Sequence, residues 1–328
     1  MNGVNVSGVD DWIKSKMDLL GIAPEKLSEY IFPLTTLAMT EKRIDVLSCI
    51  LGGNDVPSKE VLNTVMGEDG TVLHSAALVG HIEVMEWLID KRAEVEARNG
   101  RGQTPLFSLV SAGHINAIKW LVNEKSADVN ARDSKGRPAI SLAPFSEKPQ
   151  QVVETLKELG ADVNAKGNEG DTPMFYAIMK DNPECIKTLY KLGADLKDSK
   201  GNNFIFMASM NGNIKSIECL IKDLGVDVES KNNDGATPLI MSIFTGQIES
   251  IKCLINLGAN VNTGLNGLAP MFFAIVQGNV ECMECLKKFG AKLDIKITKN
   301  GKDMSLLDVA IENCQTGAVE WLRANGVK

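Results

Sequence analysis

The chain repeats one short unit, and this repetition constrains its fold more than any other feature. The clearest copy runs from Asp234 to Asn262, DGATPLIMSIFTGQIESIKCLINLGANVN. Copies recur about every 33 residues. Each opens with a Thr-Pro pair or its equivalent, at Thr71-Val72, Thr104-Pro105, Pro138-Ala139, Thr172-Pro173, Asn203-Phe204, Thr237-Pro238, Ala269-Pro270 and Ser305-Leu306.

Local sequence signals predict two helices in this unit. Thr237 can N-cap an inner helix over 238–244, and Pro238 suits its first turn, where the missing N–H would have no partner anyway. Apolar residues at helical spacing predict an outer helix over 248–257, which Gly258 ends in the left-handed conformation. We expect the tail, 259–262, to run extended. Such a pair is apolar on two sides and needs a neighbour on each.

The motifs resemble those of the ankyrin-repeat family. The best copies are GTVLHSAALVGHIEVMEWLI from Gly70 and GQTPLFSLVSAGHINAIKWLV from Gly102, and the resemblance covers nearly everything from about Phe32 onward. It implies an all-α repeat solenoid, an ankyrin-repeat array of stacked helix-turn-helix units with β-turn or hairpin tips and degenerate caps at both ends. It also implies a protein that binds other proteins.

The repeat register divides the chain into three parts. Residues 1–66 are expected to form an N-terminal helical cap that includes a degenerate repeat at Phe32–Leu51. Seven ankyrin-like repeats occupy 67–297, and a capping repeat occupies 298–328. Terminal repeats are expected to be atypical, because they shield an apolar face from water.

Two segments are expected to depart from the pattern. Pro144 falls inside an inner helix, where proline removes a backbone hydrogen bond and costs about 3 kcal/mol. We predict a shortened or kinked helix there, a local change in the curvature of the array, and an outer helix that starts at Pro149. At the N-terminus, residues 1 to about 9 are expected to fray, Asp10 or Asp11 to begin a helix through Leu20, and Pro24-Glu25 to open another.

Composition narrows the function classes. The net charge of −7 argues against attraction to nucleic acid or to an anionic membrane surface. The N-terminus lacks the pattern of a secretory signal, and no stretch approaches the roughly 20 apolar residues of a membrane span. We therefore expect a cytoplasmic protein, and a monomer because both ends are capped.

The sequence offers no catalytic, cofactor-binding or metal-binding site. His74 stands where the family's histidine bonds to the turn backbone, and His81 and His114 stand in the breaks between helices. Cys282 and Cys285 have C-x-x-C spacing, but they lie within one predicted helix without a second pair, which favours packing. We expect the protein not to be an enzyme and to need no cofactor.

The predicted binding surface combines two sets of residues. The first is the last residue of each inner helix, which is large and apolar at most copies, and the second is a group of basic turn tips. The partner-binding candidates are Leu78, Phe145, Met179, Met210, Phe244, Val276, Arg101, Lys135 and Arg137. For each apolar residue, partial burial against the next repeat is an equal alternative, and for each basic residue a solvated turn charge is the stronger one.

These observations predict an interaction module, a scaffold or adaptor that binds a protein or peptide partner along its concave side. Two other roles stay open: a regulatory subunit of an enzyme, and a microbial effector that binds host proteins.

Overall fold

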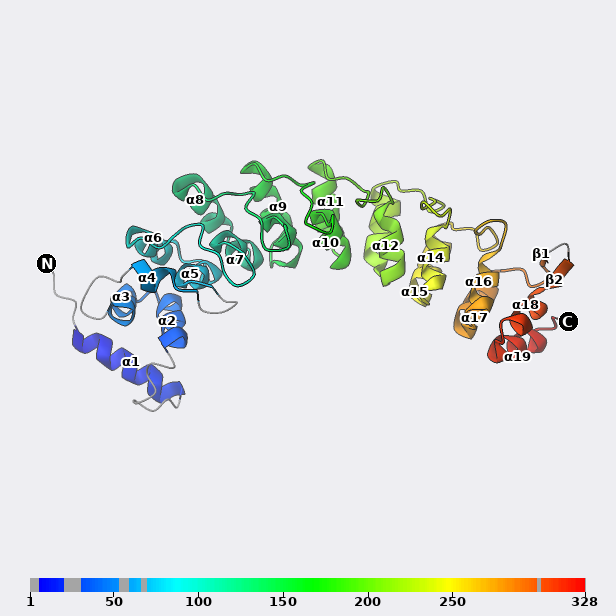
Figure 1. The fold of residues 1–328 in the computed structure, drawn as a ribbon, viewed down its shortest axis with the longest axis horizontal. Helices are drawn as coiled ribbons and strands as arrows, with labels where there is room; N and C mark the ends of the chain where they lie inside the picture. The colour runs from blue at the N-terminus through cyan, green and yellow to red at the C-terminus, as the bar shows by residue number, and fades with distance from the viewer. Residues whose placement is uncertain (1–5, 21–30, 53–58, 66–69, 300–301, 328) are drawn as a thin grey trace. The chain divides into compact units, whose positions relative to one another are not determined.

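A computed structural model describes residues 6–20, 31–52, 59–65, 70–299 and 302–327, and it divides the chain into two compact units. The N-terminal unit is Met1–Glu169 and the C-terminal unit is Gly170–Lys328. Both consist of short helix pairs in series (Figure 1). The predicted boundaries at 66 and 297 fall inside these units and stay predictions.

The N-terminal unit begins with helices that precede the regular pairs. The degenerate pair predicted from Phe32 to Leu51 is present as the second and third helices, and α2 packs against α5. The elements are α1 (Val6–Leu20), α2 (Ile31–Thr40), α3 (Ile44–Gly52), α4 (Lys59–Asn63), α5 (Val72–Val79), α6 (Ile82–Asp90), α7 (Pro105–Ala112), α8 (Ile115–Lys125), η2 (Ala139–Phe145) and α9 (Pro149–Glu158).

The C-terminal unit continues the same order and adds one β-hairpin. Inner helices contact inner helices, and outer helices contact outer helices. The elements are α10 (Pro173–Met179), α11 (Pro183–Lys191), α12 (Phe204–Asn211), α13 (Ile214–Glu218), η3 (Cys219–Asp223), α14 (Pro238–Phe244), α15 (Ile248–Asn256), α16 (Pro270–Val276), α17 (Val280–Lys288), β1 (Lys296–Lys299), β2 (Lys302–Ser305), α18 (Leu306–Glu312) and α19 (Thr316–Ala324).

A column of small side chains lets neighbouring inner helices approach closely. The fifth residue after each helix-opening position is Ala or Ser in seven of the eight copies. All seven are completely buried: Ala76, Ala143, Ala177, Ala208, Ser242, Ala274 and Ala310. Larger apolar residues, such as Leu73 and Met174, fill the space on either side. Each unit therefore has a ribbon-shaped core, as a stack of repeats requires.

The predicted helix in the clearest copy is confirmed in detail. Helix α14 starts at Pro238, and the Thr237 hydroxyl accepts a hydrogen bond from the Ile240 amide at 3.4 Å. Helix α15 is followed by Gly258 in the left-handed conformation, with φ of 103°.

The predicted disturbance at Pro144 is also confirmed. Residues Ala139–Phe145 form a 3₁₀ helix instead of an α-helix, and Pro149 is the first residue of α9. The tighter turn has i→i+3 hydrogen bonds, so the N–H that proline lacks is less costly there than in an α-helix.

Two predictions about chain ends and tails are wrong. Helix α1 begins at Val6, so residues 6–9 are helical instead of frayed, and the helix starts before Asp10; residues 1–5 and the helix predicted at Pro24 lie outside the described part of the chain.

The tails form tight turns instead of running extended. In the clearest copy, the Asn260 side chain accepts from the Asn262 amide at 2.9 Å, and its carbonyl accepts from the Thr263 amide. Asp and Asn favour such turns because their side chains can bond to the backbone two residues on.

The copies that open at Thr104, Pro138 and Asn203 each carry one extra residue, and in the first and third the outer helix absorbs it. In the copy at α13, the Leu224 amide donates to the Cys219 carbonyl, so η3 is a π-type turn. In the copy at α8, the outer helix extends to Lys125 and ends at Ser126 in the left-handed conformation.

Two glycines at helix ends distinguish the cost of a clash between stacked repeats from the cost of backbone strain alone. Gly80 and Gly160 both have positive φ, but a Cβ on Gly80 would lie 2.4 Å from the His114 ring, whereas Gly160 has nothing within 4 Å. We predict that Gly160→Ala costs about 1–2 kcal/mol of stability from strain alone and that Gly80→Ala costs clearly more. Urea unfolding followed by circular dichroism measures both; equal losses would show that the His114 contact is unimportant.

Candidate functional site

Residues in the last turn of the inner helices lie at the surface of both units. In the N-terminal unit, Leu78 and Phe145 are exposed, and in the C-terminal unit Met179, Met210 and Phe244 are exposed, with exposed fractions between 36% and 58%. Val276 is half-buried. We call these residues the inner-helix stripe of their unit: Leu78 and Phe145 in the N-terminal unit, and Met179, Met210, Phe244 and Val276 in the C-terminal unit. The first five are thus partly exposed and partly buried, which agrees both with a binding role and with the alternative of partial burial against the next repeat; Phe244, for example, packs on Phe273 of the next copy.

Side chains from the following repeat hold the backbone of this stripe. The His114 Nε2 atom lies 2.9 Å from the Leu78 carbonyl oxygen, so it donates when that nitrogen is protonated. In the C-terminal unit, the Gln315 amide donates to the Val276 carbonyl at 2.9 Å. Helix C-terminal carbonyls have no partner within their own helix, and here the neighbouring repeat supplies the donor. The stripe residues are thus fixed in position although they are exposed.

Two pockets lie along the stripe of the C-terminal unit. The first has a volume of about 290 Å³ and includes Met210, Phe175, Met207 and Met241 in its lining. The second has a volume of about 540 Å³, and its apolar lining is Phe244, Leu268, Phe272, Phe273, Val276, Ile297, Met304 and Val309. The second pocket falls in the size range of sites that bind organic ligands or anchor side chains.

Sequence reasoning identified only part of each pocket lining. It missed Met207 and Met241, which lie three residues before Met210 and Phe244 and therefore share their helix face. That spacing was a signal that could have been used. The sequence gives no sign that Ile297 and Met304 belong to this pocket. They line it from the β1–β2 hairpin, where they are cross-strand partners.

The aromatic rings in the second pocket are fixed by edge-to-face contacts. Phe244 and Phe273 have ring centroids 5.4 Å apart at 79°, and Phe272 and Phe273 lie 5.2 Å apart at 90°. Such pairs contribute about 0.5–1.5 kcal/mol beyond the area they bury. The pocket wall is therefore partly preorganised for an apolar group.

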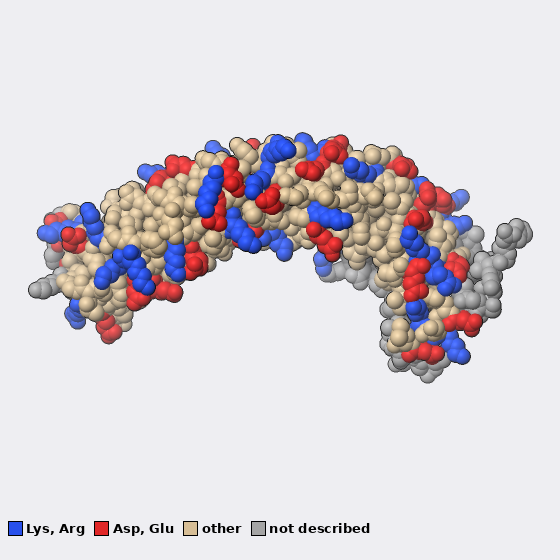
Figure 2. Space-filling model, turned by 180° about the vertical axis from the view of Figure 1, so that it is seen from behind, with Lys and Arg blue, Asp and Glu red and all other residues tan. Residues whose placement is uncertain are grey.

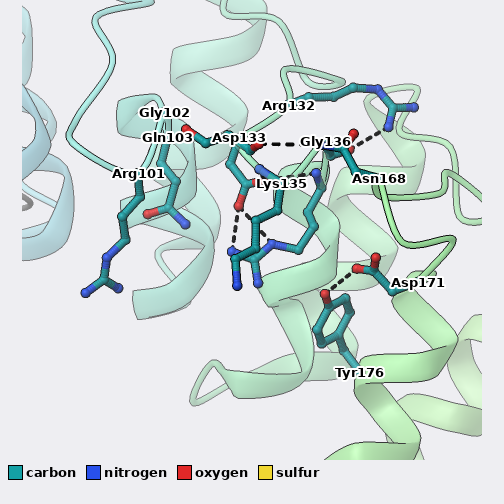
Figure 3. A network of polar contacts seen from close by, with 12 residues as sticks. Arg101, Gly102, Gln103, Arg132, Asp133, Lys135, Gly136, Asn168, Asp171 and Tyr176 are labelled. Atoms are coloured by element: carbon teal, nitrogen blue, oxygen red, sulfur yellow. Dashed lines mark hydrogen bonds and ion pairs between the residues drawn. The ribbon is translucent and has the colours of Figure 1, made fainter.

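The basic turn tips of the N-terminal unit have divergent roles (Figure 3). Arg101 and Lys135 are exposed, as predicted. The Arg137 guanidinium instead forms a two-pronged ion pair with the buried Asp133 carboxylate, at 2.9 and 2.6 Å. Much of its charge is thus already neutralised within its own turn.

Two further arginines act as clamps between neighbouring turns. The Arg98 Nη1 atom donates to the carbonyls of Gly102 and Arg132 at 2.7 and 2.6 Å. Arg132 repeats this arrangement one copy later, with the carbonyls of Gly136 and Lys166, both at 2.6 Å. The sequence shows these residues as turn charges and gives no sign of the clamping role.

Histidine 74 cross-links two turns. Its Nδ1 accepts from the Thr71 amide at 3.2 Å, so Nε2 carries the proton and donates to the Gln103 carbonyl at 2.8 Å. The predicted bond to the turn backbone is confirmed. Burial lowers the pKa of His74, and the bond to the Gln103 carbonyl opposes this only partly.

Of the described cysteines, Cys185, Cys219, Cys282 and Cys285 are buried, Cys253 is half-buried and Cys314 is exposed. Burial raises the pKa of Cys185 and of Cys282 to about 12, so both are thiols and poor nucleophiles at neutral pH. Cys285 is buried beside Cys282, as the packing interpretation predicts. Among the described residues, no group of three or more His, Cys, Asp or Glu side chains could hold a metal ion.

Charges of both signs are interspersed over the face shown in Figure 2. Across the residues described, no helix is both long enough and apolar enough to cross a membrane.

Comparisons with known proteins agree with the stacked helix pairs. Family models described as ankyrin repeats (3 copies) match residues 34–133 and 192–264, and a model described as ankyrin repeats (many copies) matches 145–190. The crystal structure of the human ASB11 ankyrin repeat domain is similar to this chain, with 25% sequence identity and a TM-score of 0.54; the match covers 67% of this chain and 98% of that one. No curated protein matches the chain.

The chain belongs to the ankyrin-repeat family. Its fold is an all-α repeat solenoid. Proteins of this family are general protein–protein interaction modules and are typically not enzymes, so the class of function is protein binding.

The His74 cross-link gives a pH dependence to stability. In the folded protein the pKa of His74 lies below its ordinary value of 6.5. The stabilisation of the folded state by neutral His74 is therefore fully present above pH 6.5 and is lost as the pH falls through the folded-state pKa. We predict that the unfolding free energy falls more steeply from pH 7.5 to 5.5 in the wild type than in His74→Gln. Urea unfolding at several pH values measures this; parallel curves would contradict it.

Proposed function

We propose that this protein is a scaffold or adaptor that grips a partner protein on the inner-helix stripe. The observation that carries the proposal is the coincidence of Met210, Phe244 and Val276 with the two apolar pockets of the C-terminal unit. Each pocket can receive an apolar side chain of a partner peptide, loop or helix.

The pockets account for part of the expected affinity. Full burial of one Leu-sized or Phe-sized side chain contributes about 1.5–3 kcal/mol, so two anchors contribute about 3–6 kcal/mol. Association itself costs at least about 4 kcal/mol in lost freedom. A stable complex therefore needs contacts beyond the two pockets, and Met179 on the adjacent inner helix is exposed and suited to supply one.

Methionine is common in the lining, with Met207, Met210, Met241 and Met304 all present. Its unbranched side chain adapts to different shapes, and its sulfur makes favourable contacts with aromatic rings. This composition suits a surface that accepts apolar anchors of more than one shape.

Within this proposal the protein acts as a cytoplasmic monomer and uses no cofactor. Exposed charged residues on the last two helices, Glu312, Glu320 and Arg323, support a solvated end to the stack.

Charge introduced into the pockets tests the proposal. We predict that Met210→Glu and Phe244→Glu each abolish capture of the partner, because a carboxylate cannot be buried against an apolar anchor without a large desolvation cost. The measurement is affinity purification from cells with mass spectrometry, repeated for each variant, with helical circular dichroism to show that folding is intact.

A matched control is Tyr190→Glu. Tyr190 is 45% exposed, close to the 42% of Phe244, but it lies on the outer helix α11. It should leave capture unchanged. If partners are retained by both pocket variants, or lost equally from the Tyr190 variant, the inner-helix stripe is not the binding surface.

A further inference from the structure

The turn tips at 98–103 and 132–137, which we call the N-terminal fingers, are strongly basic in an acidic chain. They contain Arg98, Arg101, Arg132, Lys135 and Arg137 against Asp133, so their net charge is 5 − 1 = +4, whereas the whole chain has −7. The corresponding tips at 197–202 and 231–236 contain Lys197, Lys200 and Lys231 against Asp198 and Asp234, which gives 3 − 2 = +1. The positive charge is therefore concentrated in two adjacent repeats.

Backbone hydrogen bonds between neighbouring turn tips fix the positions of these fingers. The Ser134 amide donates to the Arg101 carbonyl at 3.0 Å, and the Asn168 amide donates to the Lys135 carbonyl at 2.8 Å. Arg101 and Lys135 thus occupy the same position in successive fingers. The Arg98 clamp joins the two fingers, and the Arg132 clamp joins the second finger to Lys166 of the next copy. A surface already fixed in its bound geometry loses little freedom when a ligand binds.

Three of these five basic side chains have no carboxylate partner among the described residues. Within the described part of the chain, Arg98, Arg132 and Lys135 form no ion pair with Asp or Glu, and the only carboxylate in the two fingers, Asp133, is taken by Arg137. Figure 3 shows the Arg101 side chain extending away from the finger backbone. The series of basic residues at this finger position ends at the next copy, where Glu169 replaces the residue equivalent to Lys135.

The spacing of the fingers sets the chemistry of a ligand. Stacked helices lie about 8–10 Å apart, and the fingers that precede them are spaced similarly. In the extended polyproline II conformation, three residues make one turn and span about 9 Å, so residues three apart point to the same side. Carboxylates with this spacing can therefore meet Arg101 and Lys135 together. A nucleic acid is a poorer fit, because its binding draws on many phosphate contacts and the rest of this chain repels polyanions.

We propose that the N-terminal fingers bind an extended acidic segment of a partner protein, with carboxylates about three residues apart facing Arg101 and Lys135. The inference rests on the proposed function in so far as the ligand is a protein, but it concerns a different surface. Opposite charges brought together in this way favour fast, salt-sensitive association and exclude basic partners.

The experiment uses the full chain and labelled twelve-residue peptides. The probe is four copies of Ser-Glu-Ser; the comparison peptides are four copies of Ser-Gln-Ser, and Ser₄Glu₄Ser₄ with the same composition as the probe. Fluorescence anisotropy measures each affinity at low and at high salt. We expect the probe to bind more tightly than both comparisons and its affinity to fall as salt rises.

Charge reversal then locates the site. The Arg101→Glu, Lys135→Glu double variant should weaken probe binding about tenfold or more. The matched control, Lys119→Glu with Lys157→Glu, makes the same change in net charge on outer helices α8 and α9 and should leave the affinity nearly unchanged. Circular dichroism checks folding of both.

Three results would overturn the proposal: no preference for the probe over the Gln peptide, equal weakening by the control variant, or equally tight binding of the clustered peptide and of a heparin fragment, which would indicate a nonspecific polyanion surface. The peptide-binding result is independent of the partner-capture experiment that tests the proposed function. Loss of partner capture in Met210→Glu with no probe binding to the fingers would refute only the acidic-segment inference.

Discussion

A helix pair with two apolar faces can bury both only between two neighbours, and the rest of this structure depends on that constraint. The column of Ala and Ser residues, completely buried in seven of eight copies, sets how closely the inner helices approach. Since the small residues occupy the centre of each inner helix, the large residue at its end is left at the surface. The same stacking that builds the core therefore produces the inner-helix stripe.

Stacking also provides hydrogen-bond donors for turn and helix-end carbonyls. Turn and helix-end carbonyls would lose their partners when neighbouring repeats exclude water, and an unsatisfied buried carbonyl is costly. Polar side chains from the adjacent copy provide the donors: His74 to Gln103, His114 to Leu78, and Arg98 to Arg132. Residues that look functional in the sequence, histidines and arginines above all, are in these cases used for cohesion between repeats.

Most of the fold could be predicted from the sequence because its signals are local and recur in register. Thr237 and Pro238 mark the start of one helix, Gly258 follows the end of the next, and Pro144 marks an inner segment that becomes a 3₁₀ helix. The errors have physical causes. The tails were expected to be extended, but Asn and Asp side chains close them into turns. The β1–β2 hairpin, and with it Ile297 and Met304 in the larger pocket, occurs once and has no repeated pattern to reveal it. The clamping role of Arg98 and Arg132 depends on distances between copies, which sequence spacing does not contain.

The π-type turn at Cys219–Asp223 and the longer helix α8 show where this architecture accommodates changes in length. In both copies the added residue lies in an outer helix, and the stripe position keeps its distance from the helix-opening residue. Insertions and deletions can thus accumulate during evolution in the outer helices without shifting the register of the inner-helix stripe. Peptide tags or fluorescent labels inserted at Ser126 or near Leu224 would exploit the same tolerance.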